Sequence, residues 1–354
     1  MTLKSFLNEG HNLTDKEVER AINELLKTYS RAEKEVKIQL QAVYAKYLTN
    51  VPKAEYYNVM IKFERLSKLQ QEIQNTYIFY DKMAGKQIVQ AAQLSMSNSY
   101  YRTQYATSWQ APLKFIALDQ RLVELSVFGA PELFKEIQAE ALRKIKSGTW
   151  RYGRLEKYIP QYGTLTDLLA RNRLDAVKKI NQTITQGFIQ GNSYKTMAGQ
   201  IQDVFATEAF KAQRIAHTET HRVAAHGDYL VAKDVEAQGT KIVRQWSSVL
   251  DTGTRSNHAA LDGEIVGIDE PFSAGIMTPG DWPEAGDLIN CRCVVNLLVV
   301  KDGKPLPPEL RRGRNPVADN DGKFQNEVFS YRQFDKWAEE NNLKQNKNGE
   351  YYKN

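Results

Sequence analysis

Residues 18–47, VERAINELLKTYSRAEKEVKIQLQAVYAKY, carry an apolar residue at every third or fourth position. Such steps place side chains on one face of an α-helix, so the pattern predicts one long amphipathic helix. The stripe consists of Val18, Ile22, Leu25, Tyr29, Ala32, Val36, Leu40, Val43 and Tyr47. Upstream, Thr14 is followed three residues later by Glu17. This pair has the form of a capping box and predicts that the helix begins there.

A second apolar stripe follows the break at residues 50–52, Asn-Val-Pro. Its members are Tyr56, Val59, Phe63, Leu66, Leu69, Ile73, Tyr77 and Tyr80. Two long helices joined by a short Pro-containing link favour an antiparallel hairpin or a coiled coil. Polar and aromatic residues from Ser95 onward blur the pattern before Pro112, and a further helix is predicted near residues 131–146.

The middle of the chain predicts a hinge followed by more helices. Residues 147–164 are rich in Gly and aromatic side chains, which is typical of a linker. Helical patterns resume at about 165–190 and restart at Ser193, a residue suited to an N-cap. A long helix is expected from about 207 to 238, ending at Gly239.

After Gly239 the sequence pattern changes from helical to strand-like. Residues 241–250 and 291–300 read as strands, with many turn residues between them. Residues 241–300 hold 4 Lys and Arg against 8 Asp and Glu, a net charge of −4, whereas residues 1–240 carry +8. The sequence therefore predicts an α+β protein, in which a long-helix, coiled-coil-like N-terminal region precedes a small α+β module with few short strands.

These patterns give four expected segments. They are a long-helix region at 1–146, a hinge at 147–164, an α+β module at 165–300 with its core at 207–300, and a loosely ordered tail at 301–354 with one late helix near 330–340.

Composition excludes several classes of protein. The net charge of +6 over 354 residues is too mild for a dedicated basic nucleic-acid domain. No apolar run approaches the roughly 18–20 residues that span a bilayer, and Met1–Gly10 lacks a secretory signal pattern. Two Cys in the whole chain exclude a disulfide scaffold.

Four of the five His and both Cys fall between positions 217 and 293. His217 and His221 are four apart and share a helix face, but a zincin needs Glu directly after the first His. Glu219 stands two residues from each His, so that interpretation fails. Glu219 instead aligns with Arg222 and His226 at helical spacing, which predicts either a partly buried, charge-compensated contact to the next module or a solvated face. We expect Glu219 to meet Arg255 or His258.

The following segment places Trp246 on a strand before a turn at Asp251 and a short helical stretch that ends at Asp262-Gly263. Asp251, Arg255 and His258 could form one hydrogen-bonded cluster, which would serve either catalysis or loop structure.

Cys291 and Cys293 would point the same way from a strand. Three interpretations stay open: two small buried core residues, two zinc ligands with His258 as a third, or a redox pair. A disulfide closing so small a loop would be strained.

Together, in this order and spacing, these segments resemble the phage Mu F-like domain of minor head proteins, also called phage head morphogenesis proteins. The family signature is an Arg-x-x-x-Thr-Glu helix, Trp with a following Asp, Arg-x-x-His-x-x-Leu-Asp-Gly, and a Pro-rich loop ending in Cys-x-Cys. The matching residues are Arg214, Thr218, Glu219, Trp246, Asp251, Arg255, His258, Leu261, Asp262, Gly263, Phe272, Pro283, Cys291, Arg292 and Cys293. The resemblance covers about residues 190–300.

The resemblance implies a low-copy virion component of a tailed phage or prophage, located inside the capsid near the portal and in the host cytoplasm during assembly. It would contact the portal protein and the major capsid or scaffolding protein, and help head assembly or genome packaging and delivery. The basic helical region could also bind packaged DNA non-specifically. No membrane partner and no catalytic residue are expected, and no cofactor beyond zinc at His258, Cys291 and Cys293.

Some relatives carry a toxin domain after this module, but the residues after position 300 are too few for an ordinary enzyme domain. The alternative function is a metal-dependent hydrolase or nuclease that uses Glu219, Asp251, His258 and the two Cys.

Overall fold

The structure is a computed structural model that describes residues 3–108, 110–129, 165–248, 254–306, 339–345 and 351–353. It forms two compact units that interleave along the chain. The helical unit is Glu19–Gln90 with Leu165–Ala216, and the mixed unit draws on Met1–Val18, Ala91–Thr164 and His217–Asn354. This division differs from the sequential one expected from the sequence, because three long helices each contribute to both units.

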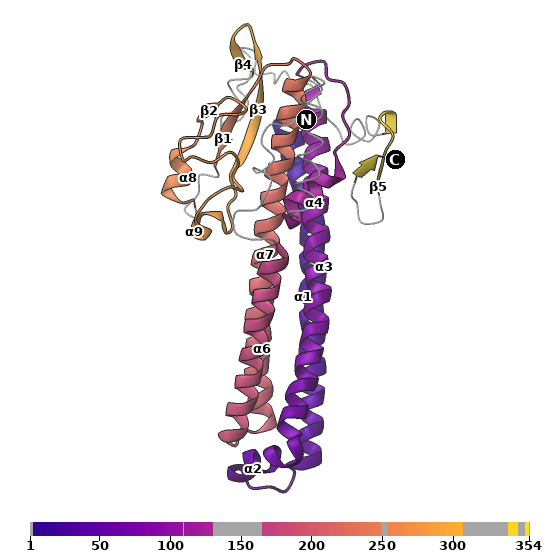
Figure 1. Cartoon of the computed structure of the whole chain (residues 1–354), viewed down its shortest axis with the longest axis vertical. Coiled ribbons are helices and arrows are strands. Elements are labelled where there is room, and N and C mark those ends of the chain that lie inside the picture. The colour runs from indigo at the N-terminus through magenta and orange to yellow at the C-terminus, as the bar shows by residue number, and fades with distance from the viewer. Residues whose placement is uncertain are drawn as a thin grey trace, which may run out of the picture. The chain divides into compact units, whose positions relative to one another are not determined.

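The helical unit is built from long helices whose apolar stripes face one another. Its elements, with their full bounds, are α1 (Leu3–Tyr47), the 3-10 turns η1 (Lys53–Glu55) and η2 (Lys62–Glu64), α2 (Tyr56–Ile61), α3 (Arg65–Ser108), α6 (Leu165–Ile189) and α7 (Tyr194–Ala237). Within this unit α2 contacts α6 (Figure 1).

The predicted stripe of α1 is buried as far as Leu40 and then continues through Tyr44 and Leu48. The sequence pattern had placed Val43 and Tyr47 there, and both are only partly buried. Repeated steps of four follow from the period of 3.6 residues per turn, which allows several such steps in a row.

Two predicted helix boundaries are wrong. Helix α1 begins at Leu3, so Thr14 lies inside the helix and not at its N-terminus. The second stripe is interrupted at η2, where Phe63 and Glu64 have positive φ angles of 53° and 58°. Phe63 is consequently 77% exposed and is not part of the core that the stripe predicted.

The start of α7 is as predicted, since the backbone N–H of Thr196 donates to Ser193 Oγ at 3.2 Å in an N-cap. However, α7 is one continuous helix and does not begin anew near residue 207. The predicted end at Gly239 is confirmed, with a φ of 85° that suits glycine.

The polar residues of α3 that blurred the sequence pattern lie inside the mixed unit, against α7. Ser95 Oγ donates to the carbonyl of Thr220 at 3.0 Å, and Ser99 Oγ donates to Asp228 at 2.6 Å. The helix therefore continues to Ser108, because α7 satisfies these side chains.

The mixed unit also contains a four-stranded antiparallel sheet in the order β2-β1-β3-β4 (Figure 1). The strands are β2 (Ile265–Val266), β1 (Ile242–Ser247), β3 (Val294–Lys301) and β4 (Lys304–Leu306), and the short helices are α4 (Gln120–Phe128), α8 (Ser256–Ala260) and α9 (Ala285–Leu288). A separate hairpin pairs β5 (Leu343–Gln345) with β6 (Tyr351–Lys353). The α+β class is confirmed.

Strand β3 begins at Val294, so Cys291 and Cys293 precede the strand that was predicted to contain them. The predicted helix at 131–146 and hinge at 147–164 lie outside the described residues, as does most of the late helix near 330–340. Among the described helices, none is both long and apolar enough to span a membrane.

Candidate metal centre

A buried apolar cluster beside β1 encloses His258 and the two cysteines. Its members are Trp246, Leu261, Phe272, Ile276, Trp282, Leu288, Cys291 and Cys293. The rings of Phe272 and Trp282 both meet Trp246 edge-on, at centroid distances of 5.1 and 6.1 Å. Trp282 stacks on His258 at 4.2 Å, so the imidazole is covered on one face by an aromatic ring.

Backbone contacts fix His258 on α8. Ser248 Oγ donates to the His258 carbonyl at 2.5 Å and accepts from Trp246 Nε1 at 3.0 Å. At the N-terminal end of α8, Arg255 donates to the carbonyls of Asp287 and Ile289. The short helix is thus tied both to β1 and to the segment that leads into Cys291.

The cysteines are positioned by a turn at Asn290, which has a positive φ of 55°. Asn tolerates this left-handed conformation better than most residues. Its N–H donates to Thr218 Oγ1 at 3.3 Å, and the next N–H, of Cys291, donates to the Leu288 carbonyl. The turn joins α9 to the short segment that carries both cysteines.

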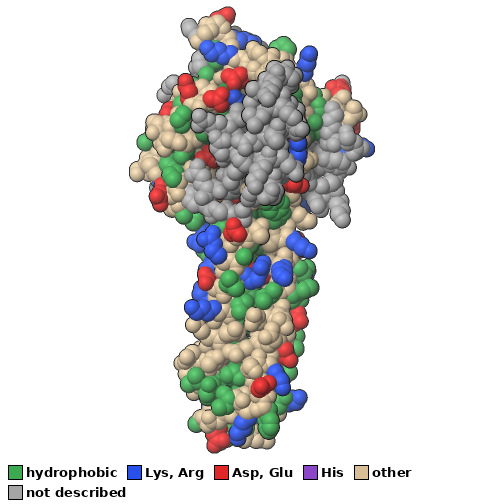
Figure 2. Space-filling model, in the orientation of Figure 1, with side chains coloured by type: hydrophobic (Ala, Val, Ile, Leu, Met, Phe, Trp, Pro, Cys, Tyr) green, Lys and Arg blue, Asp and Glu red, His purple; other side chains and the backbone are tan. Residues whose placement is uncertain are grey.

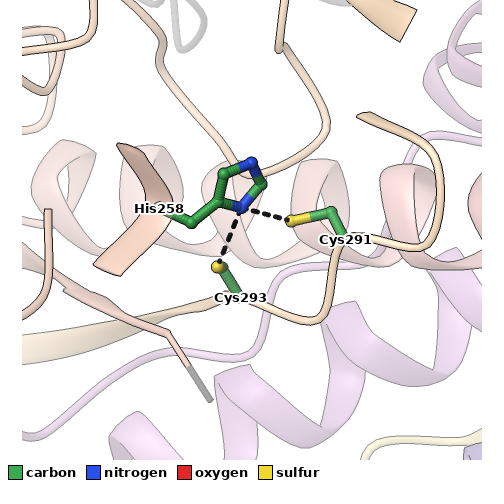
Figure 3. Close-up of side chains that lie close together, drawn as sticks. All are labelled: His258, Cys291 and Cys293. Carbon is green, nitrogen blue, oxygen red and sulfur yellow. Dashed lines mark hydrogen bonds between the residues drawn. The ribbon is translucent and has the colours of Figure 1, made fainter. Parts of the chain in front are cut away.

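Both sulfur atoms face the same ring nitrogen of His258 (Figure 3). Nδ1 lies 3.4 Å from Cys293 Sγ and 3.6 Å from Cys291 Sγ. The ligand atoms of the three residues all lie within 4.8 Å of one another, all three side chains are buried, and both cysteines are free. On the other side of the ring, Asp287 Oδ1 lies 3.7 Å from Nε2.

Their surroundings shift the pKa values of the two thiols in opposite directions. The hydrogen bond from Cys291 lowers the pKa of Cys293 to about 6, with further help from His258 and Ser248. That same hydrogen bond, together with burial, raises the pKa of Cys291. Cys293 is therefore the more acidic of the two thiols.

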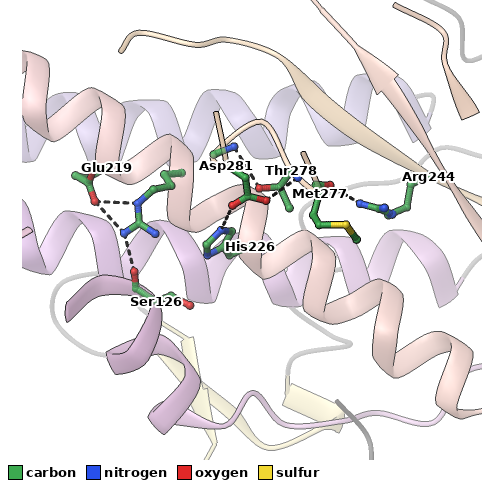
Figure 4. Close-up of polar contacts among 9 residues, drawn as sticks. Ser126, Glu219, His226, Arg244, Met277, Thr278 and Asp281 are labelled. Carbon is green, nitrogen blue, oxygen red and sulfur yellow. Dashed lines mark hydrogen bonds and ion pairs between the residues drawn. The ribbon is translucent and has the colours of Figure 1, made fainter. Parts of the chain in front are cut away.

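The Arg-x-x-x-Thr-Glu segment serves packing. Glu219 is buried, more completely than the partly buried contact that one of the two predictions expected, and accepts from Arg222 at 2.9 and 3.0 Å (Figure 4). Arg222 also donates to the carbonyl of Ser126 at 2.6 Å. The expected contact of Glu219 with Arg255 or His258 is wrong, because Arg222 already compensates the carboxylate.

A second polar cluster in the mixed unit was not predicted as a unit (Figure 4). His226 Nε2 lies 3.0 Å from Asp281, whose carboxylate also accepts from the Thr278 N–H. Arg244, buried on β1, donates to the carbonyls of Gly267, Glu270 and Met277. His226 was visible on the stripe of Glu219, but no signal in the sequence marked Arg244 or Asp281.

Two further signature residues, Asp262 and Gly263, make backbone contacts. Asp262 accepts from the Ser248 N–H at 3.3 Å, and Gly263, with a φ of 81°, donates to the Trp246 carbonyl. Arg214 is exposed on α7, whereas Asp251 lies outside the described residues.

Among the residues that the structure describes, three or more potential ligand atoms come together only at His258, Cys291 and Cys293. Neither the His217–His221 pair nor Glu219 takes part. The predicted cluster of Arg255 with His258 is indirect, because the two meet different atoms of Asp287.

Comparisons with known proteins agree with the resemblance. Residues 178–296 match the family model described as Phage Mu protein F like protein. The chain is 28% identical over 305 residues to Minor head protein GP7 of Bacillus phage SPP1, which covers 85% of this chain and 88% of that protein.

Two further relatives match shorter segments. The NAD(+)–arginine ADP-ribosyltransferase EFV of Enterococcus faecalis is 30% identical over 179 residues, and an uncharacterized protein of Haemophilus influenzae is 30% identical over 127. The chain spans 34% and 26% of their lengths. No solved structure matches significantly. Residues 178–296 are thus similar to the phage Mu protein F like family, and the chain is similar over most of its length to a minor head protein.

Proposed function

We propose that this chain is a minor head protein that acts without catalysis, by binding the portal protein and the inner surface of the capsid during head assembly and genome packaging or delivery. The similarity to Minor head protein GP7 of phage SPP1 carries the proposal, because it extends over 85% of the chain and 88% of that protein. The protein would reside in the virion interior near the portal, and in the host cytoplasm during assembly.

The internal polar residues favour a structural role. Glu219, which the enzyme alternative would need as a free carboxylate, is buried against Arg222. Asp262 and Arg255 engage backbone groups of neighbouring loops. Groups that are committed to backbone and ion-pair contacts hold the loops of the mixed unit in place and are not available to a substrate.

The helical unit offers the surface suited to protein partners. Of the large hydrophobic side chains that are exposed, eight lie in this unit: Ile38, Ile61, Phe63, Phe79, Met83, Leu174, Ile189 and Phe210. The mixed unit contributes Ile265 alone to this described set. Exposed aromatic side chains are the usual anchors of protein interfaces, so we assign portal binding to the helical unit.

The test is co-purification with the portal protein encoded in the same genome. Phe63→Asn and Phe79→Ser should each weaken binding at least tenfold, whereas Ile265→Ser, which changes an exposed hydrophobic side chain of the mixed unit, should leave it unchanged. A wild-type chain that fails to bind the portal protein would contradict the portal assignment. Equal losses in all three variants would contradict the assignment to the helical unit.

Packaged DNA is a second candidate partner of the helical unit. This unit holds 19 Lys and Arg against 12 Asp and Glu, a net charge of +7, which exceeds the +6 of the whole chain. Figure 2 shows these charges interspersed with acidic and hydrophobic side chains on the visible face, not gathered into one field. DNA binding, measured by fluorescence anisotropy, should therefore be weak, sequence-independent and steeply reduced by salt.

A further inference from the structure

We propose that His258, Cys291 and Cys293 bind one zinc ion, which fastens α8 to the chain segment entering β3. Cys291 and Cys293 follow His258 by 33 and 35 residues in the sequence, and the three side chains converge in one buried place (Figure 3). Nitrogen and thiolate sulfur are the donors that zinc prefers in structural sites.

The spacing of the donor atoms fits a tetrahedral ion. Zinc with Zn–S bonds of about 2.3 Å and a Zn–N bond of about 2.0 Å holds each sulfur roughly 3.5 Å from the nitrogen. The observed separations from His258 Nδ1 are 3.4 Å to Cys293 and 3.6 Å to Cys291. One small ion bound to all three atoms would satisfy both of these nitrogen–sulfur separations.

A hydrogen bond accounts for this geometry less well. Nδ1 carries at most one hydrogen, which can point at only one of the two sulfur atoms. The second sulfur is then directed at the other cysteine and not at the nitrogen. A metal ion gives all three atoms one common partner, because both sulfurs and the nitrogen donate lone pairs to the same centre.

The second nitrogen of the ring lies near a carboxylate, the kind of group that commonly accompanies zinc-bound histidines. Asp287 Oδ1 lies 3.7 Å from Nε2, on the side of the imidazole away from the cysteines. A carboxylate on this side favours a proton on Nε2 by its charge, and so the tautomer in which Nδ1 presents its lone pair to the metal; at 3.7 Å the contact is electrostatic and not a hydrogen bond. Trp282, stacked on the same ring at 4.2 Å, holds its orientation.

Two thiolates at this buried place require a cation that balances their negative charges. The cysteines lie in an apolar cluster, where two negative charges without compensation would be costly. Arg255 is engaged with two backbone carbonyls. A zinc ion with two thiolates and one neutral imidazole has no net charge, and a water molecule completes the four ligands.

The experiment uses the full chain purified without a polyhistidine tag. Elemental analysis should find one zinc per chain in the wild type, and substoichiometric zinc in Cys291→Ser, Cys293→Ser and His258→Asn. Asp287→Asn should keep the site but weaken zinc affinity by roughly 10–100-fold. His217→Asn is the matched control, since this histidine is exposed and outside the cluster, and should keep full zinc.

If the variants do not fold, cobalt binding by the wild type is measured instead. The wild type reconstituted with Co²⁺ should show a thiolate-to-cobalt charge-transfer band and the visible absorption of a tetrahedral ion. The proposal is overturned if the folded wild type takes up neither metal, if His217→Asn loses zinc while His258→Asn retains it, or if mass spectrometry shows Cys291 and Cys293 joined as a disulfide.

Discussion

Arg222 holds the carboxylate of Glu219 with two hydrogen bonds, at 2.9 and 3.0 Å, and both side chains are almost completely buried. The pair lies three residues apart on α7 and is anchored to α4 through the Ser126 carbonyl. A buried pair with this geometry stabilises one arrangement of the two helices, and the cost of breaking it exceeds the net contribution of forming it.

Arg222→Ala should destabilise the protein by about 3–5 kcal/mol, because it leaves the Glu219 carboxylate buried without a partner. Urea unfolding followed by circular dichroism measures the change. Arg214→Ala, an exposed substitution on the same helix, should stay within about 0.5 kcal/mol of the wild type. Replacing both members by Glu219→Leu and Arg222→Met should recover part of the loss. A cost for Arg222→Ala no larger than that of Arg214→Ala would contradict this description of the pair.

Two glycines on α7 should respond to alanine in opposite directions. A Cβ on Gly227 would lie 2.8 Å from the Met96 carbonyl oxygen, so Gly227→Ala should force α3 and α7 apart and lower the melting temperature. Gly199 has nothing within 4 Å of such a Cβ. Gly199→Ala should therefore stabilise the protein by about 0.5–1 kcal/mol through helix propensity. Equal effects of both substitutions would show that the helices are not closely packed at Gly227.

Phe63→Asn should weaken portal binding while leaving the stability of the protein nearly unchanged. Phe63 has a φ of 53° in η2, a conformation that Asn adopts at lower cost, while the substitution loses the contact with the Arg65 guanidinium at 5.2 Å. These effects are of similar size, so thermal unfolding should show stability within about 0.5 kcal/mol of the wild type. A large destabilisation would mean that Phe63 serves the fold, and the portal-binding test with this variant would then lose its meaning.

Removal of zinc should loosen the mixed unit. A strong chelator should lower the melting temperature of the wild type, because the ion joins α8 to the segment before β3. The same chelator should not affect Cys291→Ser/Cys293→Ser, which has no zinc to lose. Identical responses of the two proteins would assign the chelator effect to something other than this site.

The regular features of the fold could be predicted because they depend on local patterns. The stripe from Val18 to Leu40 and the cap at Ser193 follow from helical spacing and side-chain hydrogen bonding, and the structure confirms both. The break at Phe63 could not be predicted, since an aromatic residue rarely takes a positive φ angle. The continuation of α3 through Ser95 depends on α7, which no local pattern reveals.

The candidate site shows the same distinction. The Cys-x-Cys spacing and His258 were visible in the sequence, but the reason given for the shared direction of the cysteines was wrong. They precede β3, and the turn at Asn290 brings them to the histidine. The role of Asp287 depends on its position 29 residues beyond His258, which only the folded chain brings close.

The most direct test of the central claim is the composition of purified particles from the phage or prophage that encodes the chain. Quantitative mass spectrometry of intact heads should find the protein at low copy number beside the portal protein, protected from external protease until the heads are opened. Its absence from purified heads, in a lysate where the protein is expressed, would contradict a minor head protein.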